Sequence, residues 1–175
     1  MDMTKRRQIA KIAETIYVNL GLHSPVDVKA VSQELRGEVI EADLPEELDA
    51  RIEKAGDAFK IVFNSNKPDT RNNFSIAHEL GHLFLHLGYL INPEKWKSVN
   101  TYTDSVYHRF GHGEEELEAN EFAAAFLMPE KEYREVVDKN KKNDHIDISK
   151  VAKHFGVSVE AALNRGRWLG IFPWE

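Results

Sequence analysis

Two histidines and a glutamate near the middle of the chain have the spacing of a metal-dependent hydrolytic site. They stand in His78-Glu79-Leu80-Gly81-His82, an H-E-x-x-H pattern. On a helix, His78 and His82 leave the same side about 6 Å apart along the axis, so both imidazoles can reach one ion. Glu79 is turned by about 100° from His78, where it can hold a metal-bound water without being a ligand. The pattern predicts a zinc hydrolase site with two histidine ligands.

A hydrolytic zinc site needs a third protein ligand and keeps a fourth position for water. The chain has no cysteine, so histidine or carboxylate must supply that ligand. His86 continues the row, but it would lie about 12 Å from His78 along a straight helix, too far for one ion. We therefore interpret His86 as a partly buried polar neighbour.

An acidic segment, residues 114–121, offers better candidates for the third ligand. Glu118 borders the apolar stripe of that segment and is preferred, and Glu115, one turn earlier, is the alternative. The acids expected to face solvent are Glu114, Glu116 and Glu121.

Two segments with the apolar period of a helix would carry these side chains. The stripe of the first is Ala77, Leu80, Phe84 and Leu87, and Gly88 ends that helix. The stripe of the second is Ala119, Phe122, Ala123 and Phe126, and Pro129 ends it. Gly81 costs a helix about 1 kcal/mol relative to alanine, so we expect its missing side chain to admit another backbone.

The remaining helices and strands are predicted from apolar periods, helix-capping residues and turn residues. Helices are expected over residues 4–20, from a start at Ser24-Pro25-Val26-Asp27 to Gly37, and over 130–138. The pattern of residues 148–163 predicts two short helices that resemble a helix-turn-helix. The expected strands are Glu38–Ala42, Ala50–Lys54 and Phe59–Phe63, with a turn at Gly56-Asp57 between the last two. We expect the strand Phe59–Phe63 to lie beside the active-site helix and pair with an extended substrate.

A long irregular stretch, residues 88–113, joins the two ligand-bearing helices. Connections of this length are often functional, and its aromatic and histidine residues favour a loop or small hairpin that faces the substrate. The tetrahedral oxyanion of peptide hydrolysis needs a hydrogen-bond donor. The candidate donors in this stretch are His112 and Tyr107, with His108 and Tyr102 beside them.

Composition sets the broad class. The 175 residues, 42% of them hydrophobic and 30% charged, suit one globular domain. We find no segment long enough to span a bilayer and no apolar signal core near the first residues, so we expect a cytoplasmic protein without a membrane partner. The net charge of −6 argues against nucleic acid as a direct partner.

Two blocks of sequence together resemble the ImmA/IrrE-type metallopeptidase family. The first is Phe74–His86, F-S-I-A-H-E-L-G-H-L-F-L-H, and the second is Glu118–Pro129, E-A-N-E-F-A-A-A-F-L-M-P. The C-terminal I-S-K-V-A-K-H-F-G-V-S-V-E-A-A-L-N-R, the start at Ser24 and the I-V-F-N-S-N at Ile61 are also similar to this family.

The resemblance implies one zinc ion held by His78, His82 and Glu118, with Glu79 as the catalytic base. The same ligands also accept manganese. It further implies that the substrate is a protein, namely a separate helix-turn-helix repressor cut once in a stress or mobile-element response, and that the C-terminal helices belong to the peptidase fold.

The expected fold class is α+β: a mostly helical zincin-like domain over residues 1–175, with a small three-stranded sheet beside the H-E-x-x-H helix. Within it we expect N-terminal helices over 1–37, the sheet over 38–66, the active-site helices and loop over 67–138, and a C-terminal helix-turn-helix-like pair over 145–170. Two other functions remain open. One is a DNA-binding regulator that uses the C-terminal pair, and the other is a non-catalytic regulatory partner such as half of a toxin–antitoxin pair.

Overall fold

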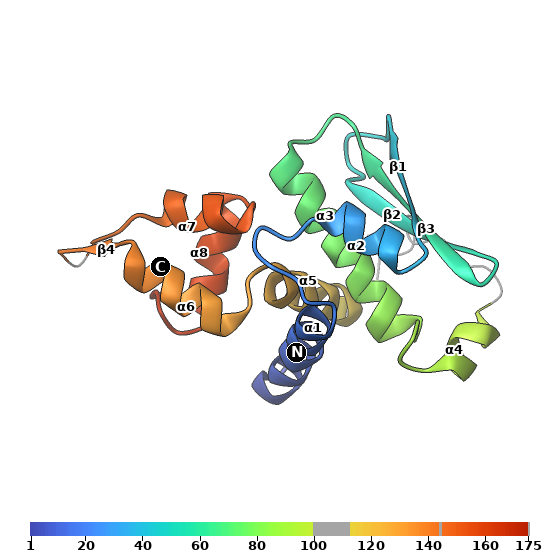
Figure 1. The fold of residues 1–175 in the computed structure, drawn as a ribbon, viewed down its shortest axis with the longest axis horizontal. Helices are drawn as coiled ribbons and strands as arrows, with labels where there is room; N and C mark the ends of the chain where they lie inside the picture. The colour runs from blue at the N-terminus through green and yellow to red at the C-terminus, as the bar shows by residue number, and fades with distance from the viewer. Residues whose placement is uncertain (100–112, 144, 175) are drawn as a thin grey trace.

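The computed structural model describes residues 1–99, 113–143 and 145–174, and it has the expected α+β architecture (Figure 1). The helices before the sheet are α1 (Met3–Asn19) and α2 (Val28–Glu34). The strands of the sheet are β1 (Glu38–Ala42), β2 (Ala50–Ala55) and β3 (Ala58–Asn64). The helices after the sheet are α3 (Asp69–Gly81), η1 (His82–His86), α4 (Pro93–Ser98), α5 (Gly113–Leu127), α6 (Glu130–Lys139), α7 (Ile148–Phe155) and α8 (Val159–Trp168). A short hairpin, β4 (Lys141–Lys142) and β5 (His145–Ile146), joins α6 to α7.

The sheet has the order β1-β3-β2, with β1 parallel and β2 antiparallel to β3. The predicted turn at Gly56-Asp57 is confirmed, since Ala55 pairs with Ala58 across it. β3 carries Phe59–Phe63, and it is the central strand with both edges already hydrogen-bonded to neighbours. Our expectation that this strand pairs with a substrate is therefore wrong, because an added strand needs a free edge.

Helices α3 and α5 form the centre of the molecule, with α1 packed on α5 and the sheet packed on α3 (Figure 1). The predicted stripes of both helices are fully or almost fully buried. Gly81 stands where α3 meets α5: a Cβ added there would lie 3.0 Å from Ala119 Cα and 3.1 Å from Ala119 O. The expected close approach of a second backbone at Gly81 is confirmed.

Two predicted element boundaries are wrong. The second helix begins at Val28 with Asp27 as its N-cap, because the Asp27 side chain accepts from the Ala30 N–H, while Ser24 bonds instead to Glu132 on α6. The H-E-x-x-H helix does not continue as an α-helix to Leu87. It widens into the π-helical turn η1, which ends with the Leu87 N–H donating to His82 O.

The C-terminal helices α7 and α8 form the expected pair. Gly156 ends α7 in a left-handed conformation, and the Ser158 hydroxyl caps α8 by accepting from Ala161 N–H. On α6, the helix before this pair, Tyr133 is fully buried and its hydroxyl donates to Ala162 O.

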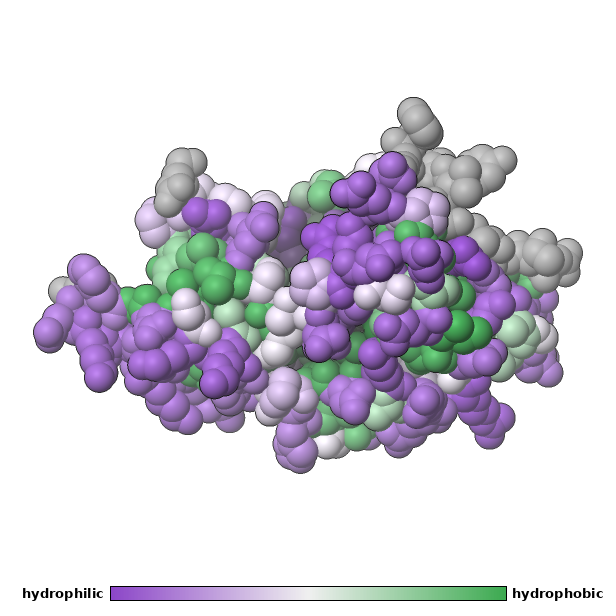
Figure 2. Space-filling model, turned by 90° about the horizontal axis from the view of Figure 1, so that it is seen from above, coloured by the Kyte–Doolittle hydropathy of each residue, from purple (hydrophilic) through white to green (hydrophobic). Residues whose placement is uncertain are grey.

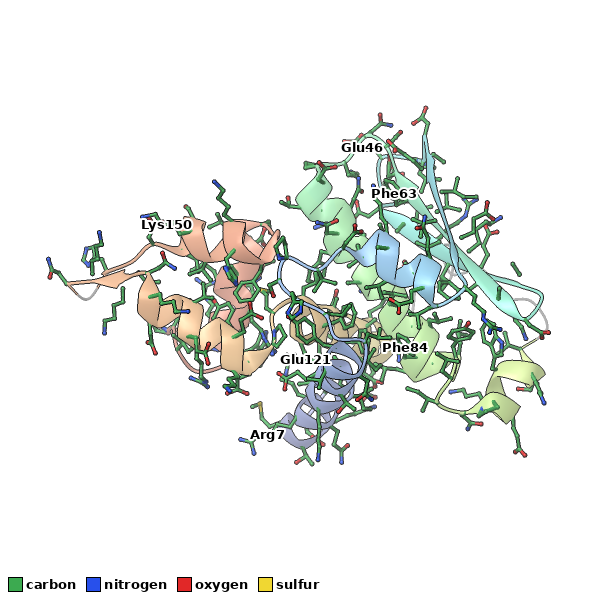
Figure 3. The ribbon with its side chains drawn as sticks, in the orientation of Figure 1. Arg7, Glu46, Phe63, Phe84, Glu121 and Lys150 are labelled. Atoms are coloured by element: carbon green, nitrogen blue, oxygen red, sulfur yellow. The ribbon has the colours of Figure 1, made fainter. Side chains whose placement is uncertain are left out.

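The C-terminal pair is tied to the rest of the molecule by a buried cluster of charges. Arg165 of α8 donates to Glu121 of α5, which also pairs with Arg6 of α1. Figure 3 labels Glu121 where α1 and α5 meet. Glu121 is 4% exposed, so the expectation that it faces solvent is wrong. Arg165 is itself buried, with 3% of its surface exposed.

The face seen in Figure 2 is mostly hydrophilic, with hydrophobic residues in small groups. Among the described residues, no helix combines the length and apolar character that crossing a membrane requires.

Candidate metal centre

The last turn of α3 and the first residue of η1 bring the two predicted histidine ligands together. The Nε2 atoms of His78 and His82 lie 3.0 Å apart. His82 is fully buried and His78 exposes 15% of its side chain, so the pair lies at the edge of the core with one side open. The predicted convergence of the two imidazoles is confirmed.

Glu116 of α5 completes a three-residue cluster with these histidines. Its carboxylate oxygens lie 3.3 Å from His78 Nε2 and 3.2 Å from His82 Nε2. Sequence reasoning expected Glu116 to face solvent and preferred Glu118. The structure places Glu118 elsewhere, against His86 and Lys5, and leaves the alternative Glu115 exposed.

The helical repeat explains which glutamate faces the histidines. Ala119 touches Gly81 across the α3–α5 contact, and Glu116 precedes Ala119 by three residues, hence by nearly one turn on the same face. Glu118 is two residues further along and therefore points to a different side of α5. Glu116, Ala119 and Ala123 also share one stripe, which is the signal in the sequence that could have identified Glu116.

The distances within the cluster suit a tetrahedral zinc ion. With nitrogen and oxygen ligands at about 2.0–2.2 Å, tetrahedral geometry separates the ligand atoms by about 3.3 Å. His78 Nε2 and His82 Nε2 lie 3.0 Å apart, one Glu116 oxygen lies 3.3 Å from His78 Nε2, and the other lies 3.2 Å from His82 Nε2. Two imidazoles and one carboxylate are also a donor set that zinc uses in hydrolytic sites.

The charge states of the cluster favour a cation. Burial lowers the pKa of His82 to about 4, so its ring is neutral and offers a lone pair near neutral pH. Burial acts to raise the pKa of Glu116, but its hydrogen bonds with His78 and His82 outweigh this and hold the pKa well below its usual value. The Glu116 carboxylate therefore brings a negative charge to a partly buried site.

Asn120 is a contact that sequence reasoning missed. Its Oδ1 lies 3.0 Å from Nδ1 of His78, and it follows Glu116 by four residues on the same face of α5. The amide oxygen accepts the Nδ1 proton of His78, which leaves the Nε2 lone pair directed at the cluster. Partners of this kind fix the orientation of metal-binding histidines.

His82 has a different outer partner. Its Nδ1 lies 2.8 Å from Nδ1 of His86, and Nε2 of His86 lies 3.3 Å from a Glu118 oxygen. The other Glu118 oxygen is paired with Lys5 of α1. As expected, His86 is partly buried and lies outside the cluster of candidate ligands.

Glu79 lies on α3 directly after His78 and is 5% exposed. Its burial and position suit the predicted base. The candidate oxyanion donors His112, Tyr107, His108 and Tyr102 lie outside the described residues.

A cavity of about 350 Å³ lies between α3, α5 and α8. Phe74 lies one turn before His78 on α3, and Asn120, the partner of His78, also lines the cavity. The remaining wall is mixed: Leu117, Ala161 and the half-exposed Trp168 are apolar, while charged residues such as Arg71 and Glu160 face them. The cavity thus reaches Asn120, the outer partner of His78, while His78, His82 and Glu116 do not line it.

Comparison with known proteins gives a family match over most of the chain. A family model described as the IrrE N-terminal-like domain, Peptidase_M78, matches residues 38–166, which include the whole ligand cluster. Among solved structures, a Mycobacterium tuberculosis transcriptional regulator is similar in fold, with a TM-score of 0.64 and 22% identity over 92% of this chain. This chain spans 46% of that protein. No curated protein matches the chain.

Proposed function

Because the chain belongs to the Peptidase_M78 family, we propose that it is a zinc-dependent endopeptidase. The observation that carries the proposal is the cluster of His78, His82 and Glu116, with separations suited to one tetrahedral ion. In this proposal Glu116 takes the place of Glu118 as third ligand, and Glu79 is the catalytic base.

The residues around the cluster have separate parts in peptide hydrolysis. A bound divalent ion supplies a Lewis acid that makes water nucleophilic near neutral pH. Glu79 accepts the proton of the attacking water and returns it to the leaving amine. Asn120 holds the His78 ring in the tautomer whose Nε2 faces the cluster.

The cavity between α3, α5 and α8, which reaches Asn120, is the proposed place for a substrate side chain. Phe74, Leu117 and Trp168 form an apolar part of its wall, which would cover the apolar portion of a substrate side chain, and charged residues such as Arg71 and Glu160 form another part. We further propose that the substrate is a helix-turn-helix repressor cut at one site. The support for this last step is the resemblance of the two motif blocks to ImmA/IrrE-type proteins.

Co-expression with a helix-turn-helix repressor encoded beside this chain tests the proposal. We expect one repressor fragment with the wild type and its loss with Glu79→Gln, because removing a general base costs roughly 10²–10⁴ in rate. Glu135→Gln, at an exposed glutamate on α6, is the matched control and should cut like the wild type. The same fragment with Glu79→Gln would show that Glu79 is not the base.

A further inference from the structure

His86 lies behind His82, on the side away from the ligand cluster. The Nδ1 atoms of the two rings are 2.8 Å apart, and Nε2 of His86 lies 3.3 Å from Glu118. His86 and Glu118 expose only 10% and 11% of their side chains, so water is a poor substitute for either contact. Lys5 holds the other oxygen of the Glu118 carboxylate.

The direction of these hydrogen bonds follows from what a metal ligand requires. His82 faces the cluster with Nε2, so Nε2 must keep its lone pair and the proton of the ring must be on Nδ1. That proton is then donated to Nδ1 of His86, which must be the unprotonated nitrogen of its own ring. The remaining proton of His86 is on Nε2 and is donated to Glu118. One protonation pattern satisfies every contact.

We propose that His86 and Glu118, anchored by Lys5, are positioning residues that hold His82 as a metal ligand. This role rests on the proposed metallopeptidase function and extends it to the residues behind the ligands. An imidazole backed by a carboxylate is a stronger and better oriented donor than an imidazole alone. The two ligands thus differ, because His78 is held by a neutral amide and His82 by a histidine–carboxylate pair.

The π-helical turn η1 gives a local reason for this geometry. It spans His82–His86 and replaces the last α-helical turn with a wider one. Turns of this kind inside α-helices occur often at functional sites. His82 and His86 are its two ends, and they are the residues joined by the 2.8 Å contact.

Zinc affinity and imidazole tautomers test the proposal. His86→Phe keeps an aromatic ring but removes the acceptor, and it should weaken zinc binding about 10- to 100-fold in competition with a chelator. His86→Gln restores an acceptor for His82 and a donor for Glu118, so it should recover most of that loss. His154→Phe, at a histidine bonded to Glu132 far along the chain, is the matched control and should bind zinc like the wild type.

The tautomers are read from long-range ¹H–¹⁵N correlation spectra of the zinc-loaded protein. We expect the proton on Nδ1 of His82 and on Nε2 of His86. The opposite pattern, or wild-type zinc affinity in His86→Phe, would overturn the positioning role while leaving the metal centre in place. A wild-type chain that takes up no zinc would overturn the metal centre itself, together with this role.

Discussion

Glu116 and Glu118 are two residues apart on α5, yet their carboxylates meet different partners. Glu116 touches the Nε2 atoms of both histidines, and Glu118 lies against His86 and Lys5. For both acids, hydrogen bonds with these partners outweigh burial and lower the pKa. Both are therefore anionic near neutral pH, and position alone decides which one can bind a metal.

This difference predicts unequal effects of one substitution. Glu116→Gln replaces an anionic ligand with a weaker neutral one, so it should lower zinc affinity by more than the roughly 10- to 100-fold typical of an outer partner. Glu118→Gln keeps an oxygen that accepts from His86, so its effect should be about tenfold or less. Isothermal titration with zinc measures both. An equal loss in the two variants, or a larger one in Glu118→Gln, would contradict the ligand assignment.

At the scale of single residues, the sequence was sufficient to bring His78 and His82 together, because their spacing within one helix fixes their geometry. It was not sufficient for Glu116, since that choice depends on how α5 is rotated against α3. The preference for Glu118 came from its place beside the apolar stripe. The side chain does border the core, but there it meets His86.

The contact between α3 and α5 is the element-scale feature on which the metal cluster depends. It brings His78 and His82 from one helix to Glu116 of the other, and Gly81 is the residue at which the two backbones meet. The nearest neighbours of an added Cβ would be backbone atoms of Ala119, which cannot rotate away.

Gly81→Ala should therefore separate the two helices in spite of its better helix propensity. The propensity gain is about 1 kcal/mol, and overpacking of a tight core contact costs about 1–3 kcal/mol. We expect a lower melting temperature, by about 2–4 °C, and weaker zinc binding. Gly113→Ala is the matched control, because nothing lies within 4 Å of its added Cβ. A Gly81→Ala protein with wild-type melting temperature and zinc affinity would show that the contact tolerates a methyl group.

The strands and most helices could be predicted because the apolar period and the turn residues that define each one lie within its own segment of sequence. The π-helical turn could not, since the apolar stripe of the helix continues through it to Phe84 and Leu87 without a local signal. The central position of β3 was missed for a related reason: strand order depends on the parallel pairing of β1 with β3, which no local pattern records.

At the scale of the whole molecule, Glu132 of α6 links the C-terminal part to the N-terminal helices. Its carboxylate accepts from Tyr17 at 3.2 Å, from Ser24 at 3.0 Å and from His154 at 2.8 Å. Burial acts to raise the pKa of Glu132, but these bonds outweigh it and the pKa is lowered. The carboxylate is therefore more stable as an anion in the folded chain than in the unfolded chain.

The sign of this shift predicts an acid-dependent stability difference. A lowered folded-state pKa contributes stability above the unfolded value of about 4.5, and that contribution is lost as the pH falls below it. Glu132→Gln should melt a few degrees below the wild type at pH 7, and the gap should narrow toward pH 3. Thermal unfolding at both pH values measures the gap. A gap that widens as the pH falls would contradict the role given to Glu132.

The position of the metal is the most direct test of the proposed function. Crystals of the zinc-loaded protein, with diffraction recorded at the zinc absorption edge, give an anomalous map that locates the ion. We expect one strong peak about 2.0–2.2 Å from Nε2 of His78, Nε2 of His82 and a carboxylate oxygen of Glu116. A peak bound instead by Glu118 or His86, or no peak between the two histidines, would contradict the proposed metal centre.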